Sequence, residues 1–450
     1  MSVPNPATLK QRVLRAGGWS FAGYGLSQAI RLGGNLIMTR LLAPEMFGVM
    51  AIATTVMVIL SMISDIGLRH NIVQSRRGED PAFLDTAWVV GIVRGILLWL
   101  AALLLSAALY FANLGGMLPA NSVYASPILP LVVAVSSLAA VILGFQSTKI
   151  ATAHRSFDQK RLVQLELTGQ FAGLLVMIAG GVMSRSIWAL VAGGLVGTLT
   201  TTVLSHAWLS GHANRLRWEK NALRDLIGFG KWLFVSSVMS VLALHGDRLL
   251  LGGFVDAQVL GLYAIAALIV GAIEGALGKL LAAIALPALS EIARNEPSRL
   301  REVYYKLRVP GDLALLFCAG LLFATGQLVI DILYDPRYSA AGEMMRILAL
   351  SFIAARYTLA YHVYLAVGNP RYLAIINVVR CVSLFVLVPC LYYYAGLQAT
   401  IWGIALHGLA IVPFVHVFNA RLGLNDLRRE LLVLIALPAG YLCGSAANLL

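Results

Sequence analysis

Long apolar stretches fill most of the chain, and short polar stretches separate them. Thirteen segments hold about 20 or more predominantly apolar residues, enough for a helix to cross about 30 Å of hydrocarbon. In lipid the backbone must satisfy its own hydrogen bonds, so each segment is predicted to be helical. The segments lie near 17–41, 48–68, 84–112, 128–148, 163–183, 187–209, 229–254, 259–286, 310–330, 343–367, 373–395, 399–419 and 431–450. This pattern predicts an all-α polytopic membrane protein.

The composition supports this fold class and leaves little room for a soluble domain. Of the 450 residues 59% are hydrophobic and 12% are charged, about half the charge of a soluble protein. The longest polar connections, near 287–309 and 113–127, are too short for a catalytic domain, and the chain has no GxxxxGK[ST] phosphate loop. We therefore expect no enzyme activity and no cofactor. The four cysteines fall inside predicted spans without metal-ligand spacing, so no metal site is expected.

The formal net charge of +13 is distributed as in a membrane protein. With the N-terminus in the cytoplasm and alternating spans, 23 of the 34 Lys and Arg residues fall in cytoplasmic segments. Only Arg40, Arg185 and Arg337 fall in the loops on the outer side, and the others lie inside predicted spans. This is the positive-inside bias, so the basic residues indicate topology rather than nucleic-acid binding. The first segment contains Arg31 and lacks the short apolar core of a cleaved signal peptide. The cytoplasmic basic residues include Arg76, Arg77, Lys149, Arg155, Lys160, Arg161, Arg215, Arg217, Lys220, Arg224, Arg294, Arg299, Arg301, Lys306 and Arg308.

A weak internal repeat relates the two halves of the chain. FGVMAIA at 47–53 aligns with LGLYAIA at 260–266, and a tryptophan precedes each glycine by 29 residues, Trp19 before Gly48 and Trp232 before Gly261. A single offset of 213 residues relates all these positions. Both halves start on the same side of the membrane, so the repeats are predicted to be parallel.

The repeat predicts two six-helix lobes around a central cavity. The first lobe covers 1–210 with helices one to six, and the second covers 211–422 with helices seven to twelve. Residues 423–450 form an extra C-terminal hydrophobic segment. Pro44 and Glu45 suit the first turn of helix two, because proline fits a helix start and an acid complements the helix dipole there.

Four blocks of sequence resemble the polysaccharide-biosynthesis flippase family, the Wzx-type lipid-linked oligosaccharide translocases. They are TRLLAPEMFGVMAIATTVMVILSMISDIGL (39–68), GFGKWLFVSSVMSVLALHGDRLLLGGF (228–254), LGLYAIA (260–266) and LPALSEIAR (286–294). With the helix spacing, the likeness covers about 1–420. The family is similar in plan to lipid II flippases and multidrug exporters, and it implies two lobes around a cavity alternately open to each side. Family members have twelve or fourteen spans, so the thirteenth segment is extra.

Charged residues inside the predicted spans are the candidates for chemistry, because an ionised side chain at the bilayer centre costs about 2.5–3.5 kcal/mol. Tyr24, Gln28, Arg31 and Asn35 follow one another at steps of four, three and four residues and share a helix face. This stripe either lines a cavity that receives an anionic headgroup or forms a hydrogen-bonded seam between helices.

Three further arginines lie well inside predicted spans: Arg94, Arg356 and Arg380. A guanidinium stays charged and can donate two parallel hydrogen bonds to a phosphate. Each arginine could instead be held in a salt bridge or a carbonyl contact. Several together favour an anionic cargo.

Asp247 is the first candidate for a group that responds to a proton or cation, followed by Glu166 and Glu274. An acid in a low-dielectric site binds a proton more readily and can load and release it. The alternative for Asp247 is a pair with one of the membrane arginines.

The hypothesis is therefore a flippase that moves an undecaprenyl-pyrophosphate-linked oligosaccharide from the inner to the outer leaflet of a bacterial inner membrane by alternating access. The lipid carrier and the sugar class come from the resemblance, which also implies a role in lipopolysaccharide or exopolysaccharide synthesis. The expected partners are membrane lipids and a polysaccharide polymerase or export complex, and we expect a monomer. The rivals are a cation-coupled multidrug exporter, a membrane polymerase or ligase, and a non-transporting scaffold. Excess intramembrane Arg and Lys disfavours the exporter, and the short outer loops disfavour the polymerase.

Overall fold

The structure is a computed structural model that describes residues 9–64 and 67–449; of residues 9–16, 224–238, 240 and 283 it describes the backbone alone. Trp232 of the predicted repeat falls among these, so its side chain lies outside the description. Helices make up all the regular structure of the described ranges. The longer helices are α1 (Leu9–Leu41), α2 (Pro44–Ile63), α4 (Pro81–Leu114), α8 (Gln159–Ser184), α9 (Trp188–Ala207), α10 (Lys220–Phe254), α11 (Ala257–Asn295), α12 (Leu300–Leu333), α16 (Pro370–Leu406), α17 (Val412–Arg421) and α19 (Ala436–Ala447). The shorter ones are α3 (Leu68–Gln74), α5 (Leu129–Ser136), α6 (Leu138–Gly144), α7 (Lys149–Arg155), α13 (Ala341–Ala349), α14 (Phe352–Ala355), α15 (Thr358–Ala366) and α18 (Leu427–Leu432).

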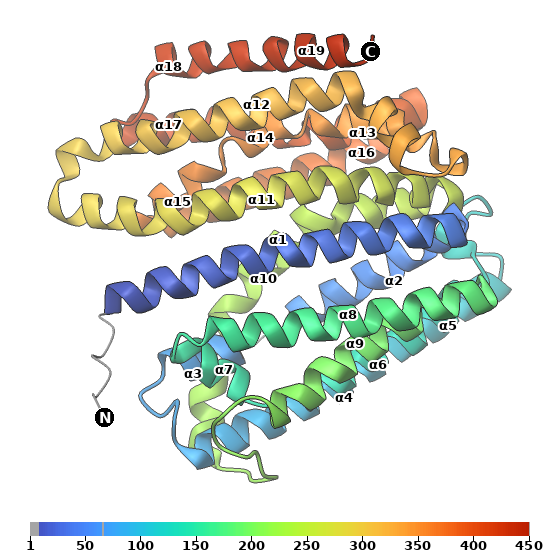
Figure 1. Ribbon diagram of the computed structural model, residues 1–450, viewed down its shortest axis with the longest axis vertical. Helices are drawn as coiled ribbons and strands as arrows, with labels where there is room; N and C mark the ends of the chain where they lie inside the picture. The colour runs from blue at the N-terminus through green and yellow to red at the C-terminus, as the bar shows by residue number, and fades with distance from the viewer. Residues whose placement is uncertain (1–8, 65–66, 450) are drawn as a thin grey trace, which may run out of the picture. The chain divides into compact units, whose positions relative to one another are not determined.

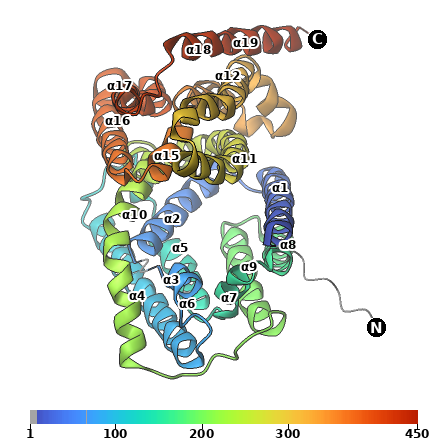
Figure 2. The same cartoon turned by 90° about the vertical axis from the view of Figure 1, so that its left-hand side faces the viewer.

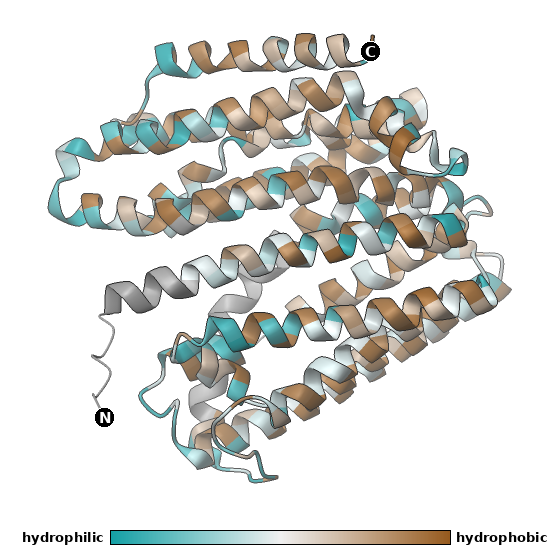
Figure 3. Ribbon diagram, in the orientation of Figure 1, coloured by the Kyte–Doolittle hydropathy of each residue, from teal (hydrophilic) through white to brown (hydrophobic). Residues whose placement is uncertain are grey.

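The helices have the length and apolarity of a polytopic membrane protein. In the described ranges eight helices are long and apolar enough to cross a membrane, or up to nine when a bent pair is taken as one span. Figure 3 shows apolar residues along the helix bodies and polar residues gathered at many of the helix ends and in the loops. The predicted fold class is confirmed.

Several predicted segments contain breaks. The fourth, near 128–148, is divided into α5 and α6, and the axis bends by 62° before α7, which follows it. The tenth is divided into α13, α14 and α15. The eleventh and twelfth segments follow each other through α16, where Gly396 has φ 76° and ψ −168° and interrupts the helical path. A positive φ of this kind is open to glycine without a Cβ penalty.

The chain forms two compact units. Unit 1 contains residues 9–42, Ile52–Ala120 and Tyr124–Val238, and unit 2 contains Ala43–Ala51, Asn121–Val123 and Met239 onward. These units differ from the predicted lobes at three places. The 211–238 segment joins unit 1, whereas the start of α2 and Asn121–Val123 join unit 2.

In unit 1, α8 lies beside α9, and α1 runs along α8 (Figure 1). The α8–α9 contact is close because glycines replace larger side chains on both helices. A Cβ added at Gly173 would lie 2.6 Å from the Gly193 carbonyl oxygen, and one at Gly193 would lie 2.7 Å from that of Gly173. On α1, Gly23 faces Val163 and Gly34 faces Leu174.

In unit 2, the C-terminal segment packs against α12 (Figure 2). A Cβ at Gly320 would lie 2.0 Å from the Leu437 carbonyl oxygen, and one at Gly440 would lie 2.1 Å from that of Phe317. The segment after 422, predicted as an extra one, is therefore an integral part of unit 2.

The two glycines that the repeat aligns also contact one another's helices. A Cβ added at Gly48 would lie 1.9 Å from the Ala257 carbonyl oxygen, and one at Gly261 would lie 1.9 Å from that of Pro44. Both positions belong to unit 2. The starts of α2 and α11 thus cross in a reciprocal contact that has room for glycine alone.

Candidate functional site

Unit 1 contains a pocket of about 390 Å³ between α2, α3, α4 and the broken span α6–α7. Its size falls at the lower end of ligand pockets, roughly 300–1,000 Å³. Most of the lining is apolar, and two arginines, Arg69 and Arg94, contribute to it. No acidic residue lines the pocket among the residues that the structure describes. The lining residues are Thr54, Met57, Val58, Ser61, Leu68, Arg69, Ile72, Ala87, Trp88, Gly91, Arg94, Gly95, Leu98, Ala139, Ala140, Leu143, Gly144, Gln146, Ser147, Thr148, Ile150 and Ala151.

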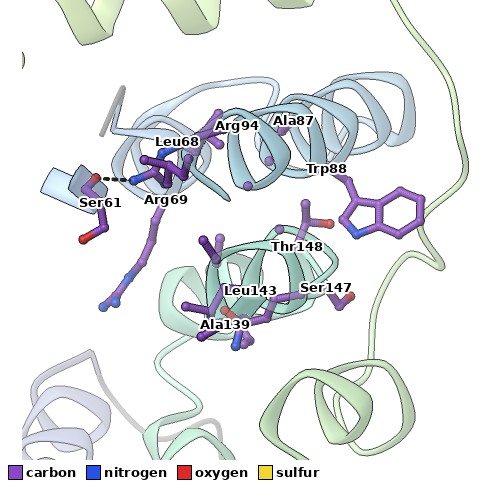
Figure 4. Close-up of a pocket in the computed structure, with 18 of the residues that line it drawn as sticks. Ser61, Leu68, Arg69, Ala87, Trp88, Arg94, Ala139, Leu143, Ser147 and Thr148 are labelled. Carbon is purple, nitrogen blue, oxygen red and sulfur yellow. Dashed lines mark hydrogen bonds between the residues drawn. The ribbon is translucent and has the colours of Figure 1, made fainter. Parts of the chain in front are cut away.

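Arg94 is anchored to the end of α2. Its Nε donates to Ser64 Oγ at 3.0 Å, and its Nη2 donates to the Ser61 carbonyl oxygen. Figure 4 shows Arg94 and Arg69 on the side of the pocket where Ser61 lies, with Leu143 and Ala139 across from them. Arg69 Nη2 lies 3.4 Å from His154 Nδ1. Two guanidinium groups therefore border a mostly apolar space.

Glycines bring α4 and α6 together at the pocket. A Cβ at Gly95 would lie 2.5 Å from the Ala140 carbonyl oxygen, and one at Gly144 would lie 2.9 Å from that of Gly91. The close approach sets the spacing of the two pocket walls.

The other wall is the break in the span between Gly144 and Lys149. Backbone groups freed by such a break need new partners in a bilayer, and neighbouring elements supply them here. The Phe145 carbonyl oxygen accepts from Trp88 Nε1 at 3.1 Å and lies 2.8 Å from His206 Nε2. The Ser147 amide donates to Ser205 Oγ at 3.0 Å. Interrupted spans of this kind form substrate sites in several transporter folds.

The polar stripe of α1 also lies in unit 1. Gln28 Nε2 donates to Tyr24 Oη at 3.0 Å, so the side chains of these two members are in contact. The contacts with α8 are made by Gly23, Ser27 and Gly34. Tyr24, Gln28 and Asn35 each follow one of these positions by one residue, which turns their side chains about 100° around the helix from it. Arg31 of the stripe is exposed at the surface of unit 1.

Glu166 lies on α8 and is exposed at the surface of unit 1. Its Oε1 accepts from Gln170 Nε2 at 3.2 Å, and the same amide donates to Ser27 Oγ of α1 at 2.8 Å. Glu166 is therefore linked to the α1–α8 contact through Gln170.

Arg380 and Glu274 belong to a polar cluster inside unit 2. Arg380 on α16 interacts electrostatically with Glu274 on α11, Tyr361 on α15 and His407. Its Nε is buried and has no hydrogen-bond partner among the described residues. The structure thus brings together one predicted cation and one predicted acid.

Asp247 lies on α10, and its Oδ2 accepts a short hydrogen bond from the Tyr263 hydroxyl of α11. Its Oδ1 is buried and makes no hydrogen bond within the described part of the chain. Tyr263 belongs to the LGLYAIA repeat, so this repeat supplies a direct partner for the predicted acid.

Arg356 lies in a buried ion-pair network of unit 2. Its Nη2 lies 3.4 Å from Glu430 Oε2, and its Nε lies 3.9 Å from Asp312 Oδ2. Arg308 lies 2.8 Å from Glu430 and 3.2 Å from Asp312, and its side chain is 1% exposed. Two guanidinium groups thus face two carboxylates in a site closed to solvent. The guanidinium of Arg356 already has anionic partners from its own chain.

The structure adds to the site several features that the sequence pattern did not reveal. Arg69 falls between predicted spans, and the break at 145–148 falls inside an apolar window. Their proximity depends on contacts between α2, α4 and α6, which are remote in sequence. Among the described residues no group of three or more His, Cys, Asp or Glu could hold a metal ion.

The fold is that of the multidrug/oligosaccharidyl-lipid/polysaccharide (MOP) superfamily transporters. An inward-facing multidrug resistance MATE transporter matches with a TM-score of 0.68 at 12% identity, covering 90% of this chain and 94% of its own. The lipid II flippase MurJ, in an inward closed conformation, matches with a TM-score of 0.67 at 13% identity and coverages of 95% and 98%. A MOP superfamily transporter from Pyrococcus furiosus, described as having a binding pocket of reverse polarity, matches with a TM-score of 0.54 at 13% identity, covering 92% and 96%.

The profile of the polysaccharide biosynthesis protein family matches residues 37–343, so the chain belongs to that family. No curated protein matches the sequence. The resemblance to the polysaccharide-biosynthesis family that was inferred from the sequence is confirmed.

Proposed function

We propose that the protein is a flippase that moves an undecaprenyl-pyrophosphate-linked oligosaccharide across the bacterial inner membrane for surface polysaccharide synthesis. The pocket of unit 1 carries this proposal, because it places Arg69 and Arg94 beside apolar walls inside a bundle of membrane-spanning helices. Guanidinium groups bind phosphates through paired hydrogen bonds and keep their charge in a low-dielectric site. Apolar walls suit the hydrocarbon that adjoins the phosphate in a lipid-linked sugar.

The pocket volume limits what it can receive. About 390 Å³ accommodates a headgroup but not a whole oligosaccharide. The pocket therefore receives the pyrophosphate end, and the remaining sugars lie outside it. Transport makes or breaks no covalent bond.

The other predicted residues enter the proposal as further contacts along the path. Arg31 with Tyr24, Gln28 and Asn35 offers a polar face on α1, and Arg380 offers a cation in unit 2. Arg356 has two carboxylate partners, so the proposal does not depend on it.

Ion coupling is proposed to involve Asp247 and Glu274 in unit 2 or Glu166 in unit 1. Asp247 has one buried oxygen outside any hydrogen bond of the described residues, and Glu274 interacts with Arg380. The cytoplasmic N-terminus and the polymerase or export partners also remain part of this proposal.

The test is translocation of a fluorescent polyprenyl-pyrophosphoryl-N-acetylglucosamine in proteoliposomes. Arg94→Ala should lower the rate more than about tenfold, because one charge-assisted bond to phosphate is worth about 1.5–3 kcal/mol. Arg94→Lys should be intermediate, since lysine keeps the charge but loses the paired donors. Arg371→Ala, an exposed arginine at the start of α16, is the matched control and should retain the wild-type rate.

Wild-type rates in both Arg94→Ala and Arg94→Lys would contradict the proposed site. Export of cationic drugs without movement of the lipid probe would favour the exporter rival. Because no acidic residue lines the pocket among the described residues, we expect movement of the lipid probe without export of cationic drugs.

A further inference from the structure

Residues 209–219 of the connection between α9 and α10 bind residues that line the pocket and are here called the strap. Asn214 of the strap binds the break in the pocket wall through three hydrogen bonds. Its Oδ1 accepts from Ser147 Oγ at 2.8 Å and from the Thr148 amide at 3.1 Å. Its Nδ2 donates to Thr148 Oγ1 at 2.6 Å. A single amide side chain thus pairs a backbone N–H and two hydroxyls of the break.

The strap also binds the opposite wall of the pocket. Asp85 of α4 has a side chain that is 4% exposed, and its Oδ1 lies 2.7 Å from His212 Nε2. The same oxygen accepts from the Arg215 amide at 2.9 Å. Because Asp85 precedes Arg94 by nine residues on α4, these contacts lie about 13 Å along the helix from the guanidinium.

The last strap residue completes the attachment. The Glu219 amide donates to Thr86 Oγ1 at 3.1 Å, and its carboxylate accepts from Arg77 Nη2 at 3.0 Å. Arg77 also donates to Asp80, the N-cap of α4, at 2.6 Å. This hydrogen bond lowers the pKa of Asp80, so the Asp80 carboxylate remains a charged partner of Arg77 at neutral pH.

We propose that the strap sets the width of the pocket and that Asn214 is its main positioning residue. The strap is bonded to Ser147 and Thr148 on one wall and to Asp85 and Thr86 on the other, and Ser147 and Thr148 themselves line the pocket. Since α6 ends at the break and α7 leaves at 62°, the hydrogen bonds of Asn214 fix where the second wall turns. Its effect on transport rests on the proposed function, whereas its effect on pocket shape does not.

Removing the contacts of the strap should alter the pocket rather than the folding of unit 1. Losing Asn214 leaves the Thr148 amide and two hydroxyls without their partner, while α4, α6 and their glycine contacts remain. We therefore expect a wider or more mobile pocket rather than an unfolded unit. Arg94 keeps its bonds to α2 and stays in place.

The experiment uses the full chain with its four cysteines replaced by alanine and a reporter introduced by Leu143→Cys in the pocket. The labelling rate with a maleimide is measured in proteoliposomes for the parent, Asn214→Ala and Asn113→Ala. Asn113 is the matched control, because it lies in unit 1 and donates to a single carbonyl oxygen, that of Ala125. Asn214→Ala should change the labelling rate at least about threefold, because it removes hydrogen bonds of ordinary strength to residues that line the pocket. Asn113→Ala should leave the labelling rate unchanged, because its hydrogen bond lies elsewhere in unit 1.

Transport provides the second readout. With the polyprenyl-pyrophosphoryl probe, Asn214→Ala should raise KM about tenfold and leave kcat unchanged, as expected when a binding geometry is lost. Thr148→Val should have a similar effect, and the double variant should be no worse than either, because the two residues act through one contact. A residue needed for folding alone would lower the amount of active protein and leave KM unchanged.

Unchanged labelling and unchanged KM in Asn214→Ala would overturn the proposal. If the wild type moves no lipid probe, the proposed function fails, but the labelling rates still decide the role of the strap. Should Asn214→Ala not fold, Asn214→Asp keeps the two acceptor contacts and removes the donation to Thr148. It should then give a smaller change in labelling, and an unchanged rate would contradict the role.

Discussion

Single residues in unit 2 are held by charge pairing across long sequence distances. Glu430 of α18 has a side chain that is 4% exposed and lies 2.8 Å from Arg308 and 3.4 Å from Arg356. Tyr305 also donates to it at 3.2 Å. A carboxylate in this position balances two buried guanidinium groups, whose other carboxylate partner among the described residues is Asp312.

Glu430→Gln should destabilise the protein strongly. Removing one partner of a buried ion pair costs about 3–5 kcal/mol, because the remaining charges stay buried without compensation. Thermal unfolding in detergent, followed by tryptophan fluorescence, should show a lower Tm. Glu291→Gln, on the exposed part of α11, is the control and should leave Tm unchanged.

The double variant Glu430→Gln with Arg308→Gln gives a sharper test of the same pairing. It removes one charge of each sign and should recover part of the lost Tm, since Arg356 and Asp312 can still pair. A double variant less stable than Glu430→Gln alone would show that packing, rather than charge balance, accounts for the loss.

The sequence identifies charged residues inside the predicted spans, but it does not identify the residues that pair with them. Position along the chain predicts that Arg308 is cytoplasmic and that Arg356 lines a cavity, but it contains no information about their partners. Their common partner lies 122 and 74 residues away. Only the Arg308–Asp312 pair has a helical spacing that the sequence displays. Arg94 lines the unit 1 pocket together with Arg69, which has no comparable signal in the sequence, and the binding role of Arg94 stays a prediction.

Among the helices, the C-terminal segment depends on two glycines for its attachment. Gly440→Ala places a methyl group where a Cβ would lie 2.1 Å from the Phe317 carbonyl oxygen, so α19 must move away from α12. Overpacking of this kind costs about 1–3 kcal/mol. The expected result is a lower Tm and a smaller yield of monodisperse protein.

Gly271→Ala is the matched control because it makes the same change inside α11, where a Cβ meets nothing within 4 Å. It should leave Tm unchanged or raise it, since alanine favours a helix over glycine by up to about 1 kcal/mol. Equal effects of the two substitutions would contradict a tight α12–α19 contact.

Hydropathy located the helices but not their breaks. The apolar windows depend on local composition, so segments such as Gln159–Ser184 and Trp188–Ala207 appear close to the predicted bounds. The break at 145–148 depends instead on Asn214, Ser205 and Trp88, whose side chains take over the backbone and hydroxyl groups there. A pattern within one segment contains no information about such partners.

For the whole chain, the repeat was the most informative part of the sequence. The offset of 213 paired Gly48 with Gly261, and the structure places these two glycines in one reciprocal contact. Equivalent positions of parallel repeats can meet in this way when a symmetry axis passes between them. The repeat predicted which residues correspond, whereas their contact required the structure.

The membrane topology can be tested from contacts within unit 1. Arg155 Nη1 donates to the carbonyl oxygens of Val73 at 2.9 Å and Ser75 at 2.6 Å, and the strap binds both α4 and the break. These loops therefore lie at one end of the unit. The 26 residues of α8 lead from that end over about 39 Å to the other. The positive-inside bias predicts that the first end lies in the cytoplasm.

The measurement is labelling of single cysteines by a membrane-impermeant maleimide in intact cells, with the native cysteines replaced by alanine. Met117→Cys and Ser184→Cys should react in intact cells, while Glu79→Cys and Arg217→Cys should react only after permeabilisation. All four positions are exposed, so access depends on the side of the membrane. Reaction of Glu79→Cys together with Met117→Cys in intact cells would break the alternation of spans. Reversal of all four would keep the helices but place the basic loops outside, against the charge distribution that orients membrane proteins.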